Sequence, residues 1–335
     1  MQKSLNFSFI IPVFNRPNEI KELLDSFAKL KYNKQFEIVI VEDGSTESSE
    51  QVVSNFKNTL SISYYKKENS GPGASRNYGM KRAKGNYFII LDSDCIVPSQ
   101  YLTTVEKYLK NNYFDCYGGA DAANDNFTPL QKAINFTMTS FFTTGGIRGS
   151  EHSIQKFEPR SFNMGISKEV FLKTDGFAKI HPGEDPDLSQ RILKAGFNTT
   201  FIPEAFVYHK RRISWQNFYT QVKKFGLVRP ILNKWHPESS KITFWFPTLF
   251  ILFVLFSVCG AIFVNTLMIT PLLGYILLIF FSSSLKNKSI SIGLLSVKAM
   301  FIQFFGYGFA FLKSNYYITF LKRDPKKQFP NLFFK

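Results

Sequence analysis

Two carboxylates one residue apart, Asp92 and Asp94, directly follow a stretch over residues 86–91 that is apolar after Asn86. A run rich in β-branched and aromatic residues predicts a strand buried on both faces, and open α/β sheets bind ligands at the carboxyl ends of such strands. Carboxylate oxygens suit Mg²⁺ or Mn²⁺, and phosphate oxygens commonly complete the shell of such a cation. The stretch therefore predicts a site for a cation and a phosphate. In the alternative interpretation, Asp94 only precedes the helix expected after Pro98.

Polar groups also close two earlier predicted strands. Residues 8–14 predict a first strand that ends at Asn15, and residues 36–41 predict a second that ends at Glu42 and Asp43. Strands that alternate with helices at this spacing indicate a mostly parallel sheet. Between these elements, helices are expected over residues 17–30 and 46–57 and a weaker strand over residues 61–65. A short helix is expected through Arg76 and Met80.

The pattern from residue 100 to residue 226 is less regular. A helix over 185–195 is preceded or opened by the acidic residues Glu184, Asp185 and Asp187. Carboxylates at that position can cap a helix or stabilise its positive N-terminal end, so these residues do not by themselves indicate chemistry. The other elements expected here are helices over 100–110 and 215–226 and strands over 115–119, 161–167, 197–202 and 205–209.

Composition limits the class of protein. The chain has 335 residues, of which 44% are hydrophobic, which is enough for one large or two modest domains. Three scattered cysteines predict neither a disulfide framework nor a zinc site, and they fit a reducing compartment. The first residues lack the pattern of a secretory signal peptide. We therefore expect the N-terminal domain to lie in the cytoplasm.

The net charge of +16 is compatible with nucleic acid, an anionic membrane surface or a phosphorylated substrate as partner. Its distribution separates these classes. Residues 244–335 carry nine Lys or Arg against one acid, Asp324, and this part is also the most apolar. Basic residues beside apolar runs are typical of proteins that meet anionic lipids, whereas nucleic-acid binders carry their charge on a soluble face or arm.

Residues 242–285 contain no charged residue. Since one membrane span needs roughly 20 apolar residues, this run predicts two short membrane helices that turn near Asn265 and Thr266. Lysines flank the run on both sides, so the positive-inside rule places both of its ends in the cytoplasm. The alternative is a buried hairpin of a soluble protein, for which so long an uncharged run is unusual.

The next apolar piece, residues 290–312, contains Lys298 and Gln303 in its interior. A buried charge is costly in a helix that faces lipid, and the long side chain of lysine can reach the membrane surface. The pattern favours an interfacial helix over a third membrane span.

Five ordered motifs together resemble the family 2 glycosyltransferases of the GT-A fold. The resemblance covers residues 8–226 and implies a Rossmann-like, mostly parallel sheet with helices on both faces. The domains expected are a GT-A domain over 1–228, a linker over 229–243, membrane helices over 244–312 and a basic cytoplasmic tail over 313–335. A finer likeness, to succinoglycan-type glucosyltransferases, rests on residues 128–146 and the apolar tail. The motifs are Pro12 to Arg16, Glu42 to Ser45, Ser70 to Asn77, Asp92 to Asp94, and Gly183 to Leu188.

The resemblance assigns four residues to the base and the phosphates of the nucleotide. Asp43 would accept a hydrogen bond from the base, with Pro12 and Asn15 lining the same pocket, because an ionised carboxylate is an acceptor only. Arg76 would contact the base or a phosphate, since its planar cation binds such oxygens well. In the alternative interpretations Asp43 forms a turn before Gly44, and Arg76 pairs with an acid at the surface.

The resemblance also implies a divalent cation, Mn²⁺ or Mg²⁺, across the donor diphosphate. Asp94 would be its ligand and Asp92 would lie toward the ribose or share the cation. His209 occupies the place where many relatives carry a histidine that joins the metal or contacts the diphosphate, and a neutral imidazole suits Mn²⁺ better than Mg²⁺. A surface histidine beside Lys210 is the alternative.

The catalytic base implied by the resemblance is Asp185, next to Glu184. A sugar hydroxyl is a poor nucleophile near neutral pH, and a positioned carboxylate that removes its proton typically contributes about 10²–10⁴-fold to the rate. Attack opposite the leaving group inverts the anomeric centre. The Gln-x-x-Arg-Trp motif of processive relatives is missing after Asp187, so transfer of a single sugar is expected.

The sequence thus predicts an inverting, metal-dependent glycosyltransferase at the cytoplasmic face of a bacterial inner membrane. The expected partners are a nucleotide-diphosphate sugar, which the family resemblance implies is a UDP-sugar, and a lipid-linked glycan of cell-surface polysaccharide synthesis, but no nucleic acid. One alternative is a polyprenyl-phosphate monosaccharide synthase, whose acceptor phosphate needs no strong base. Another is a membrane-anchored protein that binds nucleotide sugar without transferring it.

Overall fold

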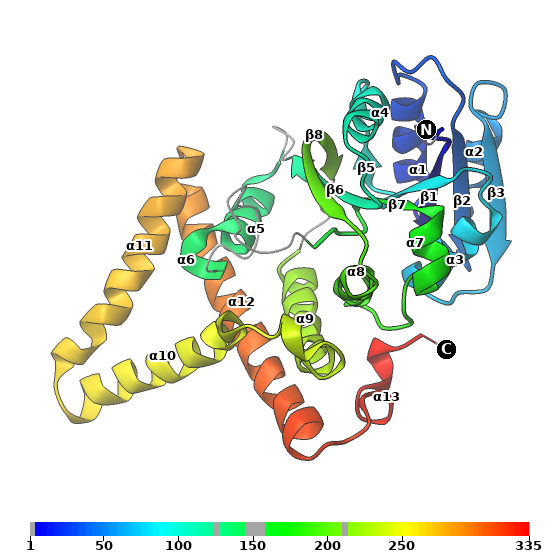
Figure 1. Cartoon of the computed structure of the whole chain (residues 1–335). Helices are drawn as coiled ribbons and strands as arrows, with labels where there is room; N and C mark the ends of the chain where they lie inside the picture. Colours follow the sequence, from blue (N-terminus) through cyan, green and yellow to red (C-terminus); the bar gives the residue numbers. More distant parts are fainter. Residues whose placement is uncertain (1–3, 123–126, 145–157, 210–213, 335) are drawn as a thin grey trace. The chain divides into compact units, whose positions relative to one another are not determined.

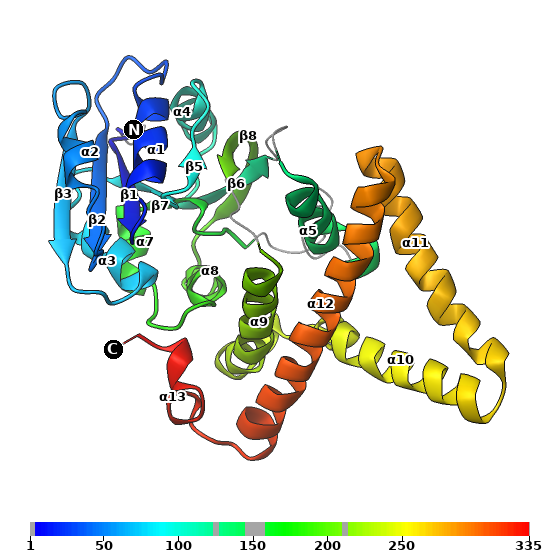
Figure 2. The same ribbon diagram turned by 180° about the vertical axis from the view of Figure 1, so that it is seen from behind.

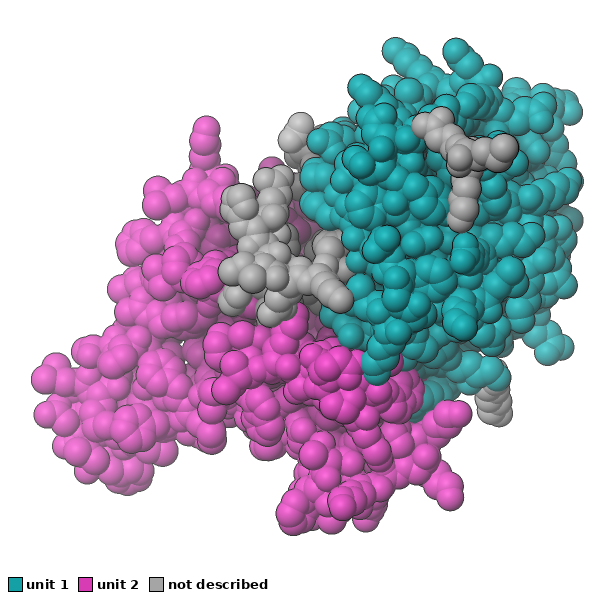
Figure 3. All heavy atoms as spheres, viewed as in Figure 1, with its two compact units in different colours: residues 1–124, 155–211, 333–335 teal, residues 125–154, 212–332 magenta. Residues whose placement is uncertain are grey.

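The structure is a computed structural model that describes residues 4–122, 127–144, 158–209 and 214–334. The chain forms two compact units (Figure 3). Unit 1 contains residues 1–124, 155–211 and 333–335, and unit 2 contains residues 125–154 and 212–332. The domain boundary expected after residue 228 falls inside helix α9 (Trp215–Trp235).

Unit 1 is built on one sheet of eight strands in the order β3-β2-β1-β4-β7-β6-β8-β5 (Figures 1 and 2). The first four strands of this order run parallel, whereas β7 is antiparallel to both of its neighbours. Strand β8 runs parallel to β6 and antiparallel to β5. The predicted mostly parallel sheet is therefore confirmed. The strands are β1 (Phe7–Val13), β2 (Glu37–Asp43), β3 (Ile62–Lys67), β4 (Tyr87–Leu91), β5 (Cys95–Ile96), β6 (Cys116–Ala122), β7 (Asn163–Ser167) and β8 (Thr199–His209).

Helices cover both faces of this sheet, as predicted, because successive strand residues point to opposite faces. On one face Phe9 of β1 packs edge-on against Phe27 of α1, with ring centres 4.6 Å apart. On the other face Ile10 belongs to a cluster with Met80 of α3 and Leu188 of α8. The first face carries α1 (Pro17–Phe27), α2 (Glu50–Ser54) and α4 (Tyr101–Asn111), and the second carries α3 (Pro72–Arg82), α7 (Lys168–Thr174) and α8 (Glu184–Lys194).

Two elements differ from the sequence expectation. The helix predicted over 46–57 is shortened to α2, because the side chain of Asn15 accepts hydrogen bonds from the backbone of Thr46 and Glu47 (2.8 and 3.0 Å). These two amides are thereby held in a loop. The separate strands predicted over 197–202 and 205–209 form one strand, β8, whose pairing with β6 shifts register between them.

Unit 2 consists of helices. The longest, α12, shares one cluster with α5, α10 and α11, in which the rings of Phe250 and Phe304 lie 4.8 Å apart. Glycines of α12 let its neighbours approach closely, since a Cβ on Gly306 would lie 2.8 Å from Val222 of α9. The helices are α5 (Pro129–Thr139), α6 (Phe141–Thr144), α9, α10 (Phe246–Phe263), α11 (Thr270–Asn287), α12 (Ile290–Asn315) and α13 (Pro325–Gln328) (Figure 1).

Three helices of the described chain are long and apolar enough to cross a membrane: 242–263, 266–287 and 290–320. The first two turn at Asn265 and Thr266, as predicted, and the Asn265 side chain accepts a hydrogen bond from the amide of Leu267 (2.9 Å). Large apolar side chains such as Phe256 and Phe263 are exposed on them, which is typical of a lipid-facing surface. By length and composition the third helix could also cross a membrane, whereas the sequence favours an interfacial position.

The lysine inside the third helix has an aromatic partner. The ammonium of Lys298 lies 4.6 Å from the centre of the Trp215 ring at the start of α9. A cation over an indole face is stabilised by the ring quadrupole, and more so where water is scarce. This contact explains how α12 carries a charge in an apolar segment.

A first prediction concerns the centre of the sheet. A Cβ on Gly165 of β7 would lie 1.9 Å from the buried ring of Tyr117, so Gly165→Ala must displace that ring. Overpacking of this kind costs typically about 1–3 kcal/mol, and we expect a lower midpoint of thermal unfolding in detergent. Gly274→Ala is the control, because a Cβ there meets nothing within 4 Å. Equal midpoints for the two variants would contradict the tight packing.

Candidate active site

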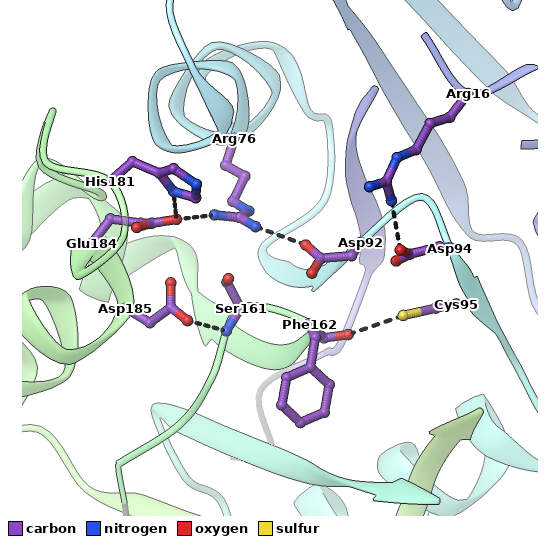
Figure 4. Close-up of polar contacts among 10 residues, drawn as sticks. All are labelled: Arg16, Arg76, Asp92, Asp94, Cys95, Ser161, Phe162, His181, Glu184 and Asp185. Carbon is purple, nitrogen blue, oxygen red and sulfur yellow. Dashed lines mark hydrogen bonds and ion pairs between the residues drawn. The ribbon is translucent and has the colours of Figure 1, made fainter. Parts of the chain in front are cut away.

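The two carboxylates that follow β4 lie in a turn rather than in the strand. Strand β4 ends at Leu91, and the backbone amide of Cys95 donates to the carbonyl of Asp92 (3.2 Å) to close the turn. Figure 4 shows Asp92 and Asp94 emerging from this turn toward different partners. Asp94 is 8% exposed, and its Oδ2 accepts a hydrogen bond from Nη1 of Arg16 at 2.5 Å. No sequence pattern indicated that ion pair.

Arg76 of α3 bridges two acids from separate parts of the chain (Figure 4). Its Nη2 donates to Asp92 Oδ1 at 2.7 Å, and its Nη1 donates to Glu184 Oε1 at 3.2 Å. The residue is 3% exposed, and its guanidinium lies 5.1 Å from the centre of the Phe177 ring. Arg76 therefore pairs with acids in the interior, whereas the sequence left a nucleotide contact and a surface ion pair as the alternatives.

Glu184 is the first residue of α8 and is buried. Besides Arg76, its Oε1 contacts Nδ1 of His181 at 3.0 Å (Figure 4). Burial alone would raise the pKa of Glu184, but the hydrogen bond and charge of His181 and the charge of Arg76 outweigh burial and hold the pKa at about 2. Glu184 is thus ionised and paired through Oε1, which suits a residue that positions its neighbours.

Asp185 has a different environment although it is the next residue. Its Oδ2 accepts a hydrogen bond from the backbone amide of Ser161 at 3.3 Å (Figure 4). Among the described residues, its buried Oδ1 has no hydrogen-bond partner. Burial raises the pKa of the Asp185 carboxyl, and the negative charge of Glu184 raises it further. A buried carboxylate with an unpaired oxygen and a raised pKa is suited to accept a proton from a ligand.

Asp43 lies at the end of β2 with most of its acceptor capacity in use. Oδ1 accepts hydrogen bonds from the ammonium of Lys67 and from the amide of Ser70 (2.9 Å), and Oδ2 accepts one from the amide of Gly71 (2.9 Å). A carboxylate offers about four acceptor positions, so these contacts leave one on Oδ2. The contacts to Ser70 and Gly71 also join β2 to the start of α3.

Pro12 and Asn15 lie at the end of β1 beside this region. Pro12 pairs with Val41 in the sheet. Asn15 has a φ of 52°, in the left-handed region that asparagine tolerates, and its backbone amide donates to Ser45 Oγ at 2.8 Å. Because its side-chain oxygen also accepts hydrogen bonds from the backbone of Thr46 and Glu47, Asn15 fixes the loop before α2. The predicted contact of both residues with a nucleotide stays a prediction.

The metal-binding prediction rests on the carboxylates of the turn. The backbone of His209 pairs with Cys95, which places position 209 beside the residue that follows Asp94, but the histidine side chain lies outside the described part of the structure. Among the described residues, no group of three or more His, Cys, Asp or Glu could hold a metal ion. One or two carboxylates suit a hard cation that completes its shell with phosphate oxygens and water.

Sequence comparisons agree with the motifs. The family model described as Glycosyl transferase family 2 matches residues 8–172. The poly(ribitol-phosphate) beta-N-acetylglucosaminyltransferase TarS of Staphylococcus aureus is 33% identical over 114 residues, which cover 33% of this chain and 20% of TarS. Glycosyltransferase GlyA of Streptococcus pneumoniae is 38% identical over 242 residues, covering 65% of this chain and 32% of GlyA. The chain thus spans a third or less of the length of these relatives.

Structural comparison supports the same fold. The mannosyltransferase PcManGT from Pyrobaculum calidifontis, solved in complex with GDP-Man and Mn²⁺, has a TM-score of 0.55 at 14% identity and covers 96% of this chain and 89% of its own. A fragment of TarS, residues 1–349, has a TM-score of 0.50 at 18% identity and covers 94% and 92%. The finer likeness to succinoglycan-type enzymes stays a prediction, and part of the stretch that carries it lies outside the described residues. Residues 8–172 are therefore part of a family 2 glycosyltransferase domain, and the chain has the GT-A fold.

Proposed function

We propose that this protein transfers one sugar, with inversion, from a nucleotide-diphosphate sugar to a hydroxyl of a lipid-linked glycan. The observation that carries the proposal is the contrast between Glu184 and Asp185. Glu184 is ionised and held by two partners, whereas Asp185 has a raised pKa and an Oδ1 with no hydrogen-bond partner among the described residues. Two adjacent carboxylates with opposed pKa shifts are the pattern expected of a positioning acid beside a general base.

Asp185 acts as the base in this proposal. Its unpaired Oδ1 would accept the proton of the acceptor hydroxyl while that oxygen attacks the anomeric carbon of the donor. The amide of Ser161 holds the other oxygen, so the carboxylate keeps one orientation. Arg76 lies between Glu184 and Asp92 and thereby fixes the helix that carries the base relative to the turn that follows β4 (Figure 4).

The donor is proposed to bind along the carboxyl ends of β2 and β4. The remaining acceptor position of Asp43 would take one N–H of the base, and uracil offers a single such N–H, which favours a UDP-sugar. Asp94 and Asp92 would hold Mn²⁺ or Mg²⁺, with His209 as a further candidate ligand, and the cation would neutralise charge on the leaving diphosphate. PcManGT, which shares the fold of this chain, was solved with a nucleotide sugar and Mn²⁺.

The acceptor is proposed to be lipid-linked because of the three apolar helices. With their basic flanks, these helices would hold the enzyme at the cytoplasmic face of a bacterial inner membrane, where lipid-linked precursors of cell-surface polysaccharides are accessible. TarS, by its name, acts on poly(ribitol-phosphate), which is a polymer.

Transfer activity tests the base. We expect Asp185→Asn to reduce release of nucleoside diphosphate by about 10²–10⁴-fold in a screen of UDP- and GDP-sugars with Mn²⁺, because an amide cannot accept the proton. Asp175→Asn is the matched control, since Asp175 is exposed at the left-handed end of α7, a conformation that asparagine tolerates. Normal transfer by Asp185→Asn would refute the assignment. Analysis of the labelled lipid product then distinguishes a glycan hydroxyl from a polyprenyl phosphate as acceptor.

Thermal stability should change in opposite directions at the two acids. Asp185 has a raised folded-state pKa, so its contribution to stability is lost as pH rises through that pKa, and Asp185→Asn should raise the unfolding midpoint at pH 7 but not below about pH 4. The depressed pKa of Glu184 contributes stability above its usual value of 4.5, so Glu184→Gln should destabilise at pH 7, by about 3–5 kcal/mol for a broken buried pair. Midpoints measured from pH 4 to pH 8 check both signs. A lower midpoint for Asp185→Asn at pH 7 would contradict the charge assignment.

Metal binding tests Asp94 separately. We expect Asp94→Asn to weaken Mn²⁺ binding in the presence of UDP by at least about tenfold, since a neutral amide replaces the ligating charge. The electron paramagnetic resonance signal of free Mn²⁺ measures this without any turnover. Asp175→Asn should titrate like the wild type. If Asp94→Asn binds Mn²⁺ as tightly as the wild type does, the cation lies elsewhere.

A further inference from the structure

A short segment late in the chain, Phe333 and Phe334, lies against the loop between α7 and α8 within unit 1. Phe333 forms an isolated antiparallel bridge with Ile180, and the amide of Phe334 donates to the carbonyl of Lys179 at 3.0 Å. Two backbone contacts therefore fix the position of the Phe334 side chain.

The ring of Phe334 packs directly on Gly71. A Cβ built on Gly71 would lie 2.2 Å from Cδ2 of that ring and 2.4 Å from Cε2, so the contact leaves no space for any other residue there. Gly71 has a φ of +89° and precedes the first residue of α3. Its amide is the group that donates to Oδ2 of Asp43.

The same ring also meets His181. The centres of the two rings lie 6.0 Å apart, with an angle of 49° between their planes. His181 is the residue whose Nδ1 contacts Glu184. One aromatic side chain thus touches both a residue that holds Asp43 and a residue that holds Glu184, although neither carboxylate touches the ring in a described contact.

We propose that Phe334 is a positioning residue of the nucleotide-sugar site, which clamps Gly71 and His181 so that Asp43 and Glu184 keep their geometry. This inference rests on the proposed function, since it assumes that Asp43 binds the nucleotide. Glycine has the largest conformational freedom of any residue type, and the Phe334 ring adds a packing contact to the two backbone hydrogen bonds that Gly71 makes, with Asp43 and with the amide of Ser75. Removal of the ring frees Gly71, and the carboxylate of Asp43 then loses a fixed donor on the oxygen proposed to meet the base.

The first test is UDP binding by calorimetry, with the full chain in detergent. An aromatic contact of this size corresponds to roughly a three- to tenfold change in affinity, so Phe334→Ala should weaken UDP binding by that factor, while Phe334→Tyr restores it. In steady-state assays, the donor KM should rise by a similar factor. Tyr113→Ala is the control, because Tyr113 packs on Tyr87 at the beginning of β4, at the opposite end of the strand from the turn.

A double-mutant cycle tests the contact itself. Gly71→Ala suffers both its positive φ and the clash with the Phe334 ring, whereas in the Phe334→Ala background only the φ strain remains. The loss of UDP affinity caused by Gly71→Ala should therefore be smaller in that background. Equal losses in the two backgrounds would overturn the proposal, as would wild-type UDP affinity of Phe334→Ala.

Asp43→Ala separates this inference from the proposed function. If Asp43→Ala binds UDP normally while remaining folded by its thermal midpoint, the proposed donor site is wrong. If Asp43→Ala loses UDP binding and Phe334→Ala binds UDP like the wild type, the donor site stands and only the role of Phe334 is refuted.

Discussion

The arrangement of the site depends on one buried cation. Arg76 is almost completely removed from water, and a buried guanidinium is tolerated only when acids compensate it. Its two partners come from the turn after β4 and from the start of α8, which lie far apart in the sequence. By pairing with both acids, Arg76 therefore holds the start of α8 close to the turn after β4. Arg76 pairs with Glu184, whereas Asp185 has no direct cationic partner among the described residues. Burial therefore raises the pKa of Asp185.

The sheet determines where these groups can meet. Because β1, β2 and β4 run parallel, the polar residues that end them, Asn15, Asp43 and Asp92, reach the same edge. Strand β7 runs in the opposite direction beside β4, so the chain before β7, which includes Ser161, enters at that edge as well. The amide that orients Asp185 is thus supplied by the reversal of one strand. A fully parallel sheet would place that segment at the other edge.

The sequence predicts the parts of the fold that depend on local pattern. Strands such as β2 and β4 are continuous apolar runs, and α1 has one apolar face, so their type and approximate position follow from periodicity. Contacts between distant polar side chains leave no such signal. The pairing of Arg16 with Asp94, and the hold of Asn15 on the loop before α2, involve residues whose local context fits a turn equally well. Long-range contacts of this kind, including that of Phe334 with Gly71, require the folded chain.

The charges at the site bear on why a divalent cation belongs to the proposed reaction. Asp92, Asp94, Glu184 and Asp185 bring four carboxyl groups, and the donor would add a diphosphate, while Arg76 is already shared by two acids. Like charges at short range in a poorly solvated site repel strongly, so the diphosphate needs a counter-charge that the described side chains do not supply in surplus. Arg16 pairs with Asp94, and its side chain is 37% exposed, so it can move at little cost. A cation that reaches Asp94 with the diphosphate would displace the Arg16 guanidinium. The guanidinium would then be available to the phosphate oxygens. The metal and the donor are therefore expected to bind together rather than one after the other.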